Sequence, residues 1–128
     1  MSTLDKKNIT GVAALLVHAA KIDEKYSEKE KHLIKNFIKS YIKDENLDEI
    51  LKTAEKLESD SNQLLNFTNI IKKESEEIKS DIIRHLWKII ISDKTVDLYE
   101  SNLMRRICGL IYFPDKMSAE IKLQILKN

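Results

Sequence analysis

The sequence predicts an all-α protein, a compact bundle of about seven helices, and three observations support that fold class. The 128 residues include only two glycines and one proline, too few for the turns of an all-β fold or the glycine-rich loops of a nucleotide-binding α/β fold. Apolar residues recur at spacings of three and four, the period of a helix with one buried face. The chain also repeats itself with an offset of 70 residues, from Asp23 to Asp93.

Length and composition indicate one globular domain over residues 1–128. A chain of this length can bury a core. Hydrophobic residues make up 42% of it and charged residues 34%, a typical soluble mixture. The formal net charge is +1, and the lysines are interspersed with glutamates. This pattern indicates solvated helix faces, so we expect no nucleic-acid partner.

The sequence also favours a cytoplasmic location and no membrane span. Cys108 is the only cysteine, so no internal disulfide can form, which fits a reducing compartment. The residues before Ile9 contain no long apolar run and do not resemble a secretory signal. The longest unbroken apolar run, Val12 to Val17, is far shorter than the roughly 20 residues that a membrane-spanning helix needs.

Apolar positions from Ile9 to Ala20 predict the first helix, which should end near Ile22. Gly11 lies inside this helix. A glycine there costs about 1 kcal/mol relative to alanine. We therefore expect another helix to approach closely at Gly11.

An acidic junction connects the first helix to the second. Ser27 and Glu30 have the spacing of a capping box, in which each side chain bonds to the backbone amide of the other residue. Tyr26 precedes the cap, where it can pack onto the following helix. The apolar stripe from Leu33 to Ile42 then predicts the second helix.

The same spacing predicts the remaining helices. Their apolar stretches are Leu47–Leu57, Leu64–Ile71, Ile78–Ile91, Leu103–Ile111 and Met117–Leu126. Ser75 is a candidate cap for the stretch that begins at Ile78. This stretch is apolar almost all round toward its end, so we expect it to be the central buried helix. Pro114 ends the sixth helix, because the residue before a proline is pushed out of helical geometry.

The repeat places an acidic junction in each half of the chain. Asp23–Glu30 matches Asp93–Glu100, and apolar positions on both sides match without a gap. Each half therefore reads as helix, junction, helix, which predicts an internal pseudo-two-fold repeat. The two junctions either form a shared site or lie apart, and the sequence leaves both arrangements open.

One interpretation of the junctions is that they bind a divalent cation. The second junction places Asp93, Thr95, Asp97 and Glu100 at its first, third, fifth and eighth positions. Alternating oxygen ligands, closed by a carboxylate on the helix, suit a hard cation such as calcium or magnesium. The loop is not an EF-hand, since it lacks the length and the central glycine of that motif.

The first junction is the weaker candidate, because Lys25 and Ser27 occupy its third and fifth positions. The other interpretation needs no ligand. Aspartate, serine and glutamate satisfy free amides and complement the positive end of a helix, so the acids would only cap helices. The predicted cation ligands are Asp23, Glu30, Asp93, Asp97 and Glu100.

No catalytic residue is predicted. The three histidines, His18, His32 and His85, form no cluster with cysteine that would indicate zinc, and we expect them to be structural or on the surface. Cys108 lies beside an apolar stripe with no histidine nearby in the sequence, which favours a packing role over that of a nucleophile. Trp87 is expected in the core.

Two stretches of the chain resemble the tellurite-resistance protein B (TerB-like) family. The first is Val12–Ala20 running into Asp23, with Ser27 and Glu30 following. The second is Leu86–Asp93, with Asp97, Tyr99–Glu100 and Leu103–Ile107 following. The resemblance covers nearly the whole chain and includes the duplicated Asp…Glu junction and its apolar lead-in.

The resemblance implies a compact bundle of about seven helices in a cytoplasmic bacterial protein. It implies a connection to tellurite resistance or to a more general stress response. It further implies metal binding through the junction acids, which carries over to Asp23, Glu30, Asp93 and Glu100; the spacing described above adds Asp97. Related domains also occur joined to J-domain co-chaperones, which implies a protein partner.

Two hypotheses about function follow. In the leading one, the chain is a non-enzymatic TerB-like stress-response domain that binds calcium or magnesium through its duplicated acidic junctions, with no other cofactor. In the alternative, it is a protein-interaction or scaffold module with an unidentified protein partner, and the junction acids only cap helices. An enzyme is the third option, and it would need convergent catalytic groups that we do not find in the sequence.

Overall fold

The computed structural model describes residues 6–22, 26–43, 46–61, 63–92 and 98–127. Within these ranges the chain forms helices and turns and no β-strand, which confirms the all-α class. Its helices are α1 (Lys6–Lys21), α2 (Glu28–Tyr41), α3 (Leu47–Asp60), α4 (Leu65–Lys72), α5 (Glu76–Ile91), α6 (Leu98–Ile111) and α7 (Asp115–Lys127). Among these helices, none has the length and apolar character needed to cross a membrane.

The starts of α2 and α5 follow the predicted cap chemistry. At α2 the Ser27 hydroxyl oxygen accepts a hydrogen bond from the Glu30 amide at 3.2 Å, and the Glu30 carboxylate accepts one from the Ser27 amide at 2.8 Å. The capping box is therefore confirmed. At α5 the Ser75 hydroxyl oxygen accepts from the Ile78 amide at 3.2 Å. These bonds satisfy amides that the helices themselves leave unpaired.

The end of α6 is closed by backbone geometry. Tyr112 adopts a left-handed conformation with φ of 60°. The amide of the next residue, Phe113, donates to the carbonyl of Cys108 at 2.9 Å, the six-to-one bond of a Schellman motif. Phe113 itself is buried, and Pro114 follows, which cannot continue the helix. The turn therefore fixes the direction in which α7 leaves.

The core is centred on α1. Every side chain from Val12 to Val17 is fully buried, and α1 packs against α2, α3, α4 and α5. We expected α5 to hold the central position. It is also deeply buried and packs against α1, α2 and α7, so the two helices share the centre of the bundle.

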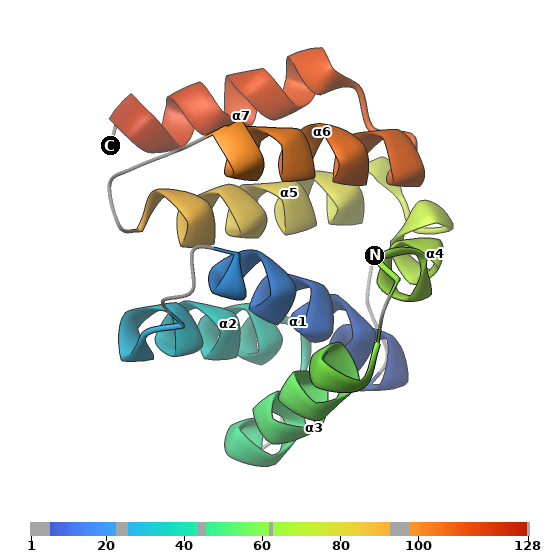
Figure 1. Ribbon diagram of the computed structural model, residues 1–128, viewed down its shortest axis with the longest axis vertical. Helices are drawn as coiled ribbons and strands as arrows, with labels where there is room; N and C mark the ends of the chain where they lie inside the picture. The colour runs from blue at the N-terminus through green and yellow to red at the C-terminus, as the bar shows by residue number, and fades with distance from the viewer. Residues whose placement is uncertain (1–5, 23–25, 44–45, 62, 93–97, 128) are drawn as a thin grey trace.

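Figure 1 shows how the other helices surround this pair. On one side of α5, α1 and α2 form a layer that α3 covers from outside. On the other side lie α6 and α7, with α7 at the outer edge of the molecule. The short helix α4 packs against both α1 and α6 and so connects the two sides.

Gly11 marks the close approach of α4 to α1, as its position inside a helix led us to expect. A Cβ atom added at Gly11 would lie 2.5 Å from Cδ1 of Ile70. The Ile70 side chain is only partly buried, and this atom is its flexible end. The close contact therefore involves one methyl group and not the backbone of α4.

A hydrogen bond and a cation–π contact of Trp87, a residue of α5, attach α7 to that helix. The buried indole N–H of Trp87 donates to the hydroxyl of Ser118 at 2.9 Å, and the ammonium group of Lys122 lies 5.0 Å from the centre of the indole ring. The expectation that Trp87 lies in the core is confirmed, since its exposed fraction is 5%. Its polar edge serves to position α7.

The effect on stability of replacing Gly11 with alanine should depend on the Ile70 side chain. Alanine gains about 1 kcal/mol of helix propensity over glycine, but the new methyl displaces Cδ1 of Ile70. We expect Gly11→Ala to stabilise the protein by about 1 kcal/mol when Ile70→Val has removed that atom, and by clearly less in the wild-type background. Urea unfolding of the four proteins in this double-mutant cycle measures the difference. Equal effects in both backgrounds would contradict the contact.

Replacing Ser118 with alanine should destabilise the protein by about 1 to 3 kcal/mol, because it leaves the buried Trp87 N–H without an acceptor. The loss should shrink when Trp87→Phe has already removed the donor, since both partners are then apolar. Urea unfolding checks this prediction. A loss of the same size in the Trp87→Phe background would show that Ser118 acts through other contacts.

Candidate functional site

The glutamate that closes the first junction is buried. Glu30 is the third residue of α2 and its exposed fraction is 4%. Its carboxylate accepts hydrogen bonds from the amide and, at 3.1 Å, from the hydroxyl of Ser27. A carboxylate this deeply buried is uncommon unless it is hydrogen-bonded or paired. The capping box therefore accounts for at least part of the role of Glu30.

The glutamate of the second junction is buried in the same way. Glu100 is the third residue of α6 and its exposed fraction is 3%. The bounds of α2 and α6 differ by 70 residues at both ends, and so do those of α1 and α5. Glu30 and Glu100 thus stand at equivalent positions of two helices of equal length, as the sequence offset predicted for these two residues.

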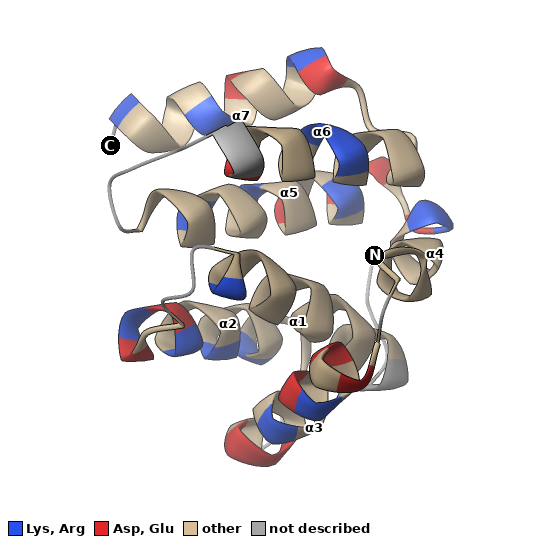
Figure 2. Cartoon of the chain, in the orientation of Figure 1, with Lys and Arg blue, Asp and Glu red and all other residues tan. Residues whose placement is uncertain are grey.

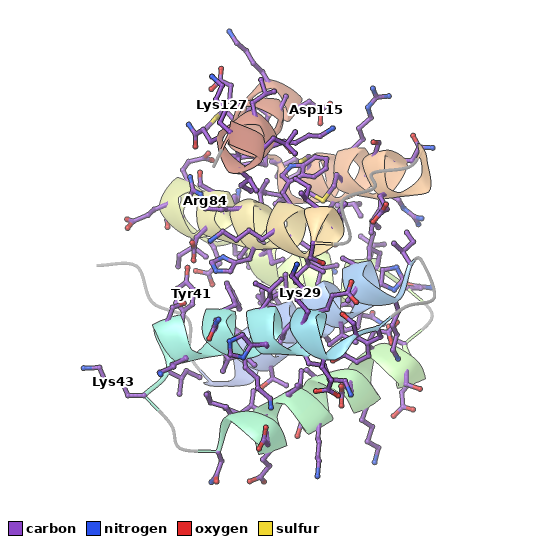
Figure 3. All side chains as sticks on the ribbon, turned by 90° about the vertical axis from the view of Figure 1, so that its left-hand side faces the viewer. Lys29, Tyr41, Lys43, Arg84, Asp115 and Lys127 are labelled. Atoms are coloured by element: carbon purple, nitrogen blue, oxygen red, sulfur yellow. The ribbon has the colours of Figure 1, made fainter. Side chains whose placement is uncertain are left out.

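A hydrogen bond brings the first junction to the start of the second. The ammonium group of Lys29, in the first turn of α2, donates to the backbone carbonyl of Ser92 at 3.1 Å. Ser92 caps the end of α5, and Asp93 is the next residue of the chain. Lys29 lies in the region between α2 and α5 in Figure 3. The contact also places a positive charge beside the second junction.

The remaining predicted ligands, Asp23, Asp93 and Asp97, lie outside the described residues. The structure therefore places two of the five predicted acids, Glu30 and Glu100, at buried helix starts. In the part of the chain that the structure describes, no group of three or more histidine, cysteine, aspartate or glutamate side chains has the arrangement of a metal site. The cation site stays a prediction.

Tyr26 ties the first junction to α3. Its hydroxyl donates to the carboxylate of Glu55 at 2.6 Å, and the ammonium group of Lys31 lies 5.1 Å from its ring centre. Burial, together with the bond to Glu55, raises the pKa of Tyr26 well above its usual range, so the phenol stays neutral. The sequence predicted that Tyr26 can pack onto the second helix, and its bond to α3 was not predicted.

A second polar cluster joins the far end of α2 to α5. The Tyr41 hydroxyl donates to the carboxylate of Asp81 at 2.7 Å. The Nδ1 atom of His85 lies 2.8 Å from the backbone carbonyl oxygen of Asp81, and the ring of Phe37 stands edge-on to the imidazole at 4.9 Å. Burial holds the pKa of His85 below its usual range, although the Asp81 carbonyl opposes the shift. Figure 3 shows Tyr41 at this end of α2.

The other side chains that could do chemistry lie on the surface or have structural roles. His32 is exposed, and His18 and Lys21 share the carboxylate of Glu58 at 3.2 and 2.8 Å. Burial opposes ionisation of Glu58, but those two hydrogen bonds outweigh it and hold the pKa of this carboxyl below its usual range. Cys108 is 1% exposed and burial raises the pKa of its thiol, which favours packing over nucleophilic chemistry.

A groove that the sequence did not indicate runs between α6 and α7. Its volume is about 250 Å³. The groove is lined by Trp87, Ser101, Met104, Arg105, Asp115, Ser118, Ala119 and Lys122. Helical periodicity predicted where the two helices lie in the sequence, but it carries no information on how they face each other.

The protonation of His85 should make stability depend on pH. Its folded-state pKa is lowered, so its stabilising contribution is complete above the unfolded value near 6.5. It is lost as pH falls from about 6.5 through the folded pKa, because the unfolded state binds the proton first. Urea unfolding between neutral pH and mildly acidic pH measures this. His85→Gln should flatten the dependence in that window, whereas the exposed His32→Gln should leave it unchanged; equal profiles would contradict the assignment.

Comparison with protein-family models found that residues 10–123 match the family described as tellurite resistance protein TerB. This range contains both junctions and all or part of every helix described above. Comparison with curated proteins and with solved structures found no match.

Proposed function

Because the chain belongs to the TerB family, we propose that it is a non-enzymatic binding domain of the tellurite-resistance or stress-response type that holds a divalent cation at its acidic junctions. Calcium or magnesium is the cation of choice, since the side chains concerned offer carboxylate oxygens. The second junction is the principal site, with Asp93, Asp97 and Glu100 as ligands. Asp23 and Glu30 contribute from the first junction.

The observation that carries this proposal is the burial of Glu30 and Glu100 at equivalent helix starts. Two buried carboxylates at equivalent helix starts suggest that the helix–junction–helix unit is duplicated. We propose that the two halves form a pseudo-two-fold repeat. The bond from Lys29 to Ser92 joins the first turn of α2 to the end of α5, one residue before the second junction, which supports a location near both junctions. A cation there would offset the cost of gathering several carboxylates, which repel one another when unpaired.

The capping box favours the alternative, a protein-interaction module whose junction acids serve only the fold. The Glu30 carboxylate already accepts two hydrogen bonds from Ser27, which is a sufficient structural reason for an acid at this position. The positive charge of Lys29 beside Ser92 would also repel a metal cation bound nearby. The two hypotheses differ in whether an added cation changes stability.

Thermal unfolding of chelator-treated protein, with and without millimolar calcium or magnesium, tests the proposal. A cation at 100 times its dissociation constant adds about 2.7 kcal/mol, which raises Tm by several degrees for a chain of this size. We expect the rise to disappear in Asp93→Asn and in Glu100→Gln. The matched control is Glu120→Gln, which removes an exposed acid of α7 and should keep the full rise.

Absence of a rise with either cation in the wild-type protein would reject the cation site and favour the capping interpretation. A rise that persists in Asp93→Asn and Glu100→Gln would place the cation elsewhere on the protein.

A further inference from the structure

The outer side of α7 carries an apolar stripe that the fold does not use. The stripe consists of Ala119, Leu123 and Leu126, which are spaced by four and then three residues and so share one face. Leu123 and Leu126 are 56% and 53% exposed. A second face of the helix holds the buried Ser118 and Ile121. The helix is thus apolar on two faces, and the bundle covers one of them.

The groove between α6 and α7 lies directly beside this stripe. Ala119 belongs to both, because it lines the groove and begins the stripe. Trp87 and Met104, which are both buried, line the interior of the groove. We call the stripe and the groove together the α7 surface. Figure 1 shows α7 at the edge of the bundle, with no other helix outside it.

Positive charge exceeds negative charge in the segment that carries the α7 surface. Residues 98–127 contain five lysines and arginines and three acids, of which Glu100 is buried. The formal charge of this segment is therefore +2, while the whole chain carries +1, which leaves −1 for all other residues. Figure 2 shows blue segments on α6 and α7, and red segments on α7 as well. The cationic residues of the segment are Arg105, Arg106, Lys116, Lys122 and Lys127.

We propose that the α7 surface binds an amphipathic helix of a partner protein whose apolar face is flanked by acidic residues. A groove beside an exposed apolar stripe is the geometry in which an amphipathic helix binds. Arg105 and Lys122 line that groove together with the acid Asp115. Lys116 and Lys127 are exposed on the same helix as the stripe, as is Glu120, so the cations are in excess. These cations attract glutamates and aspartates that flank the apolar residues of the partner.

The same charges disfavour the two other occupants. A second copy bound through its own α7 surface would bring like charges together, which costs free energy at an interface. A lipid surface needs a helix with a broad apolar face, whereas the stripe offers two leucines and an alanine beside a concave groove. The proposal does not depend on the cation site, because the α7 surface contains none of the junction acids.

The test uses a labelled synthetic peptide of about 16 residues, long enough to form a helix on binding, with leucines on one face and glutamates on the others. Fluorescence anisotropy measures its affinity for the full chain. We expect binding that weakens with added salt and falls at least about tenfold in the Leu123→Ser, Leu126→Ser double variant. Arg105→Glu should also weaken it, and a peptide with lysines in place of the glutamates should bind far less.

The matched control is Leu57→Ser, which removes a leucine of α3 that is 43% exposed and should leave the affinity unchanged. Because Leu123 and Leu126 are exposed, the double variant should keep the wild-type circular dichroism and Tm. Absence of binding, equal affinity for the lysine peptide, or equal loss in the control and the double variant would each overturn the proposal.

Two further measurements address the other occupants. Sedimentation of the protein alone should show a monomer; a dimer that the double variant dissociates would overturn the proposal in favour of a second copy. Binding of the protein to phosphatidylserine vesicles, lost in the double variant and unaccompanied by peptide binding, would overturn it in favour of a membrane. Asp93→Asn, which removes the proposed cation site, should not change peptide affinity, so failure of one proposal is distinguishable from failure of the other.

Discussion

Complete burial of α1 is the constraint on which the rest of the structure depends. From Val12 to Val17 every side chain is fully buried, so no face of this segment can meet water without loss of hydrophobic free energy. Four helices, α2 to α5, therefore pack around it. Of these four helices, α5 contacts α7 and α4 contacts α6. Through these contacts α4 and α5 hold α6 and α7 on the other side of the bundle. The acidic junctions follow α1 and α5, so the ends of these two buried helices fix where each junction begins.

Local features of the fold could be predicted because they depend on residues that are close in sequence. Helical spacing predicted the helices, and cap chemistry predicted the bonds at Ser27, Glu30 and Ser75, each within one turn of its partner. The internal offset predicted that Glu30 and Glu100 begin equivalent helices. The place of Gly11 inside a helix indicated a close neighbour, which proved to be the end of one isoleucine side chain.

Contacts between helices could not be predicted, because spacing shows which face of a helix is buried and not which helix covers it. The bond from Lys29 to Ser92 spans 63 residues of sequence, and that from Trp87 to Ser118 spans 31. Neither pair has a local signal. The groove between α6 and α7 was missed for the same reason. For the junctions, the structure shows Glu30 and Glu100 buried at helix starts, while the role of these glutamates and of the aspartates as cation ligands stays a prediction. The two proposed sites use different residues, so each proposal can be tested independently of the other.

The most direct test of the cation site is paramagnetic broadening of backbone amide NMR signals by Mn²⁺, which prefers the same oxygen ligands as magnesium and calcium. The account predicts saturable broadening at Ser92 and in the first turns of α2 and α6, reversed by added magnesium or calcium. Broadening spread along α3, where five acids and two lysines lie, would show only diffuse attraction to surface charge. That result, or no saturable broadening at all, would contradict a cation site at the junctions.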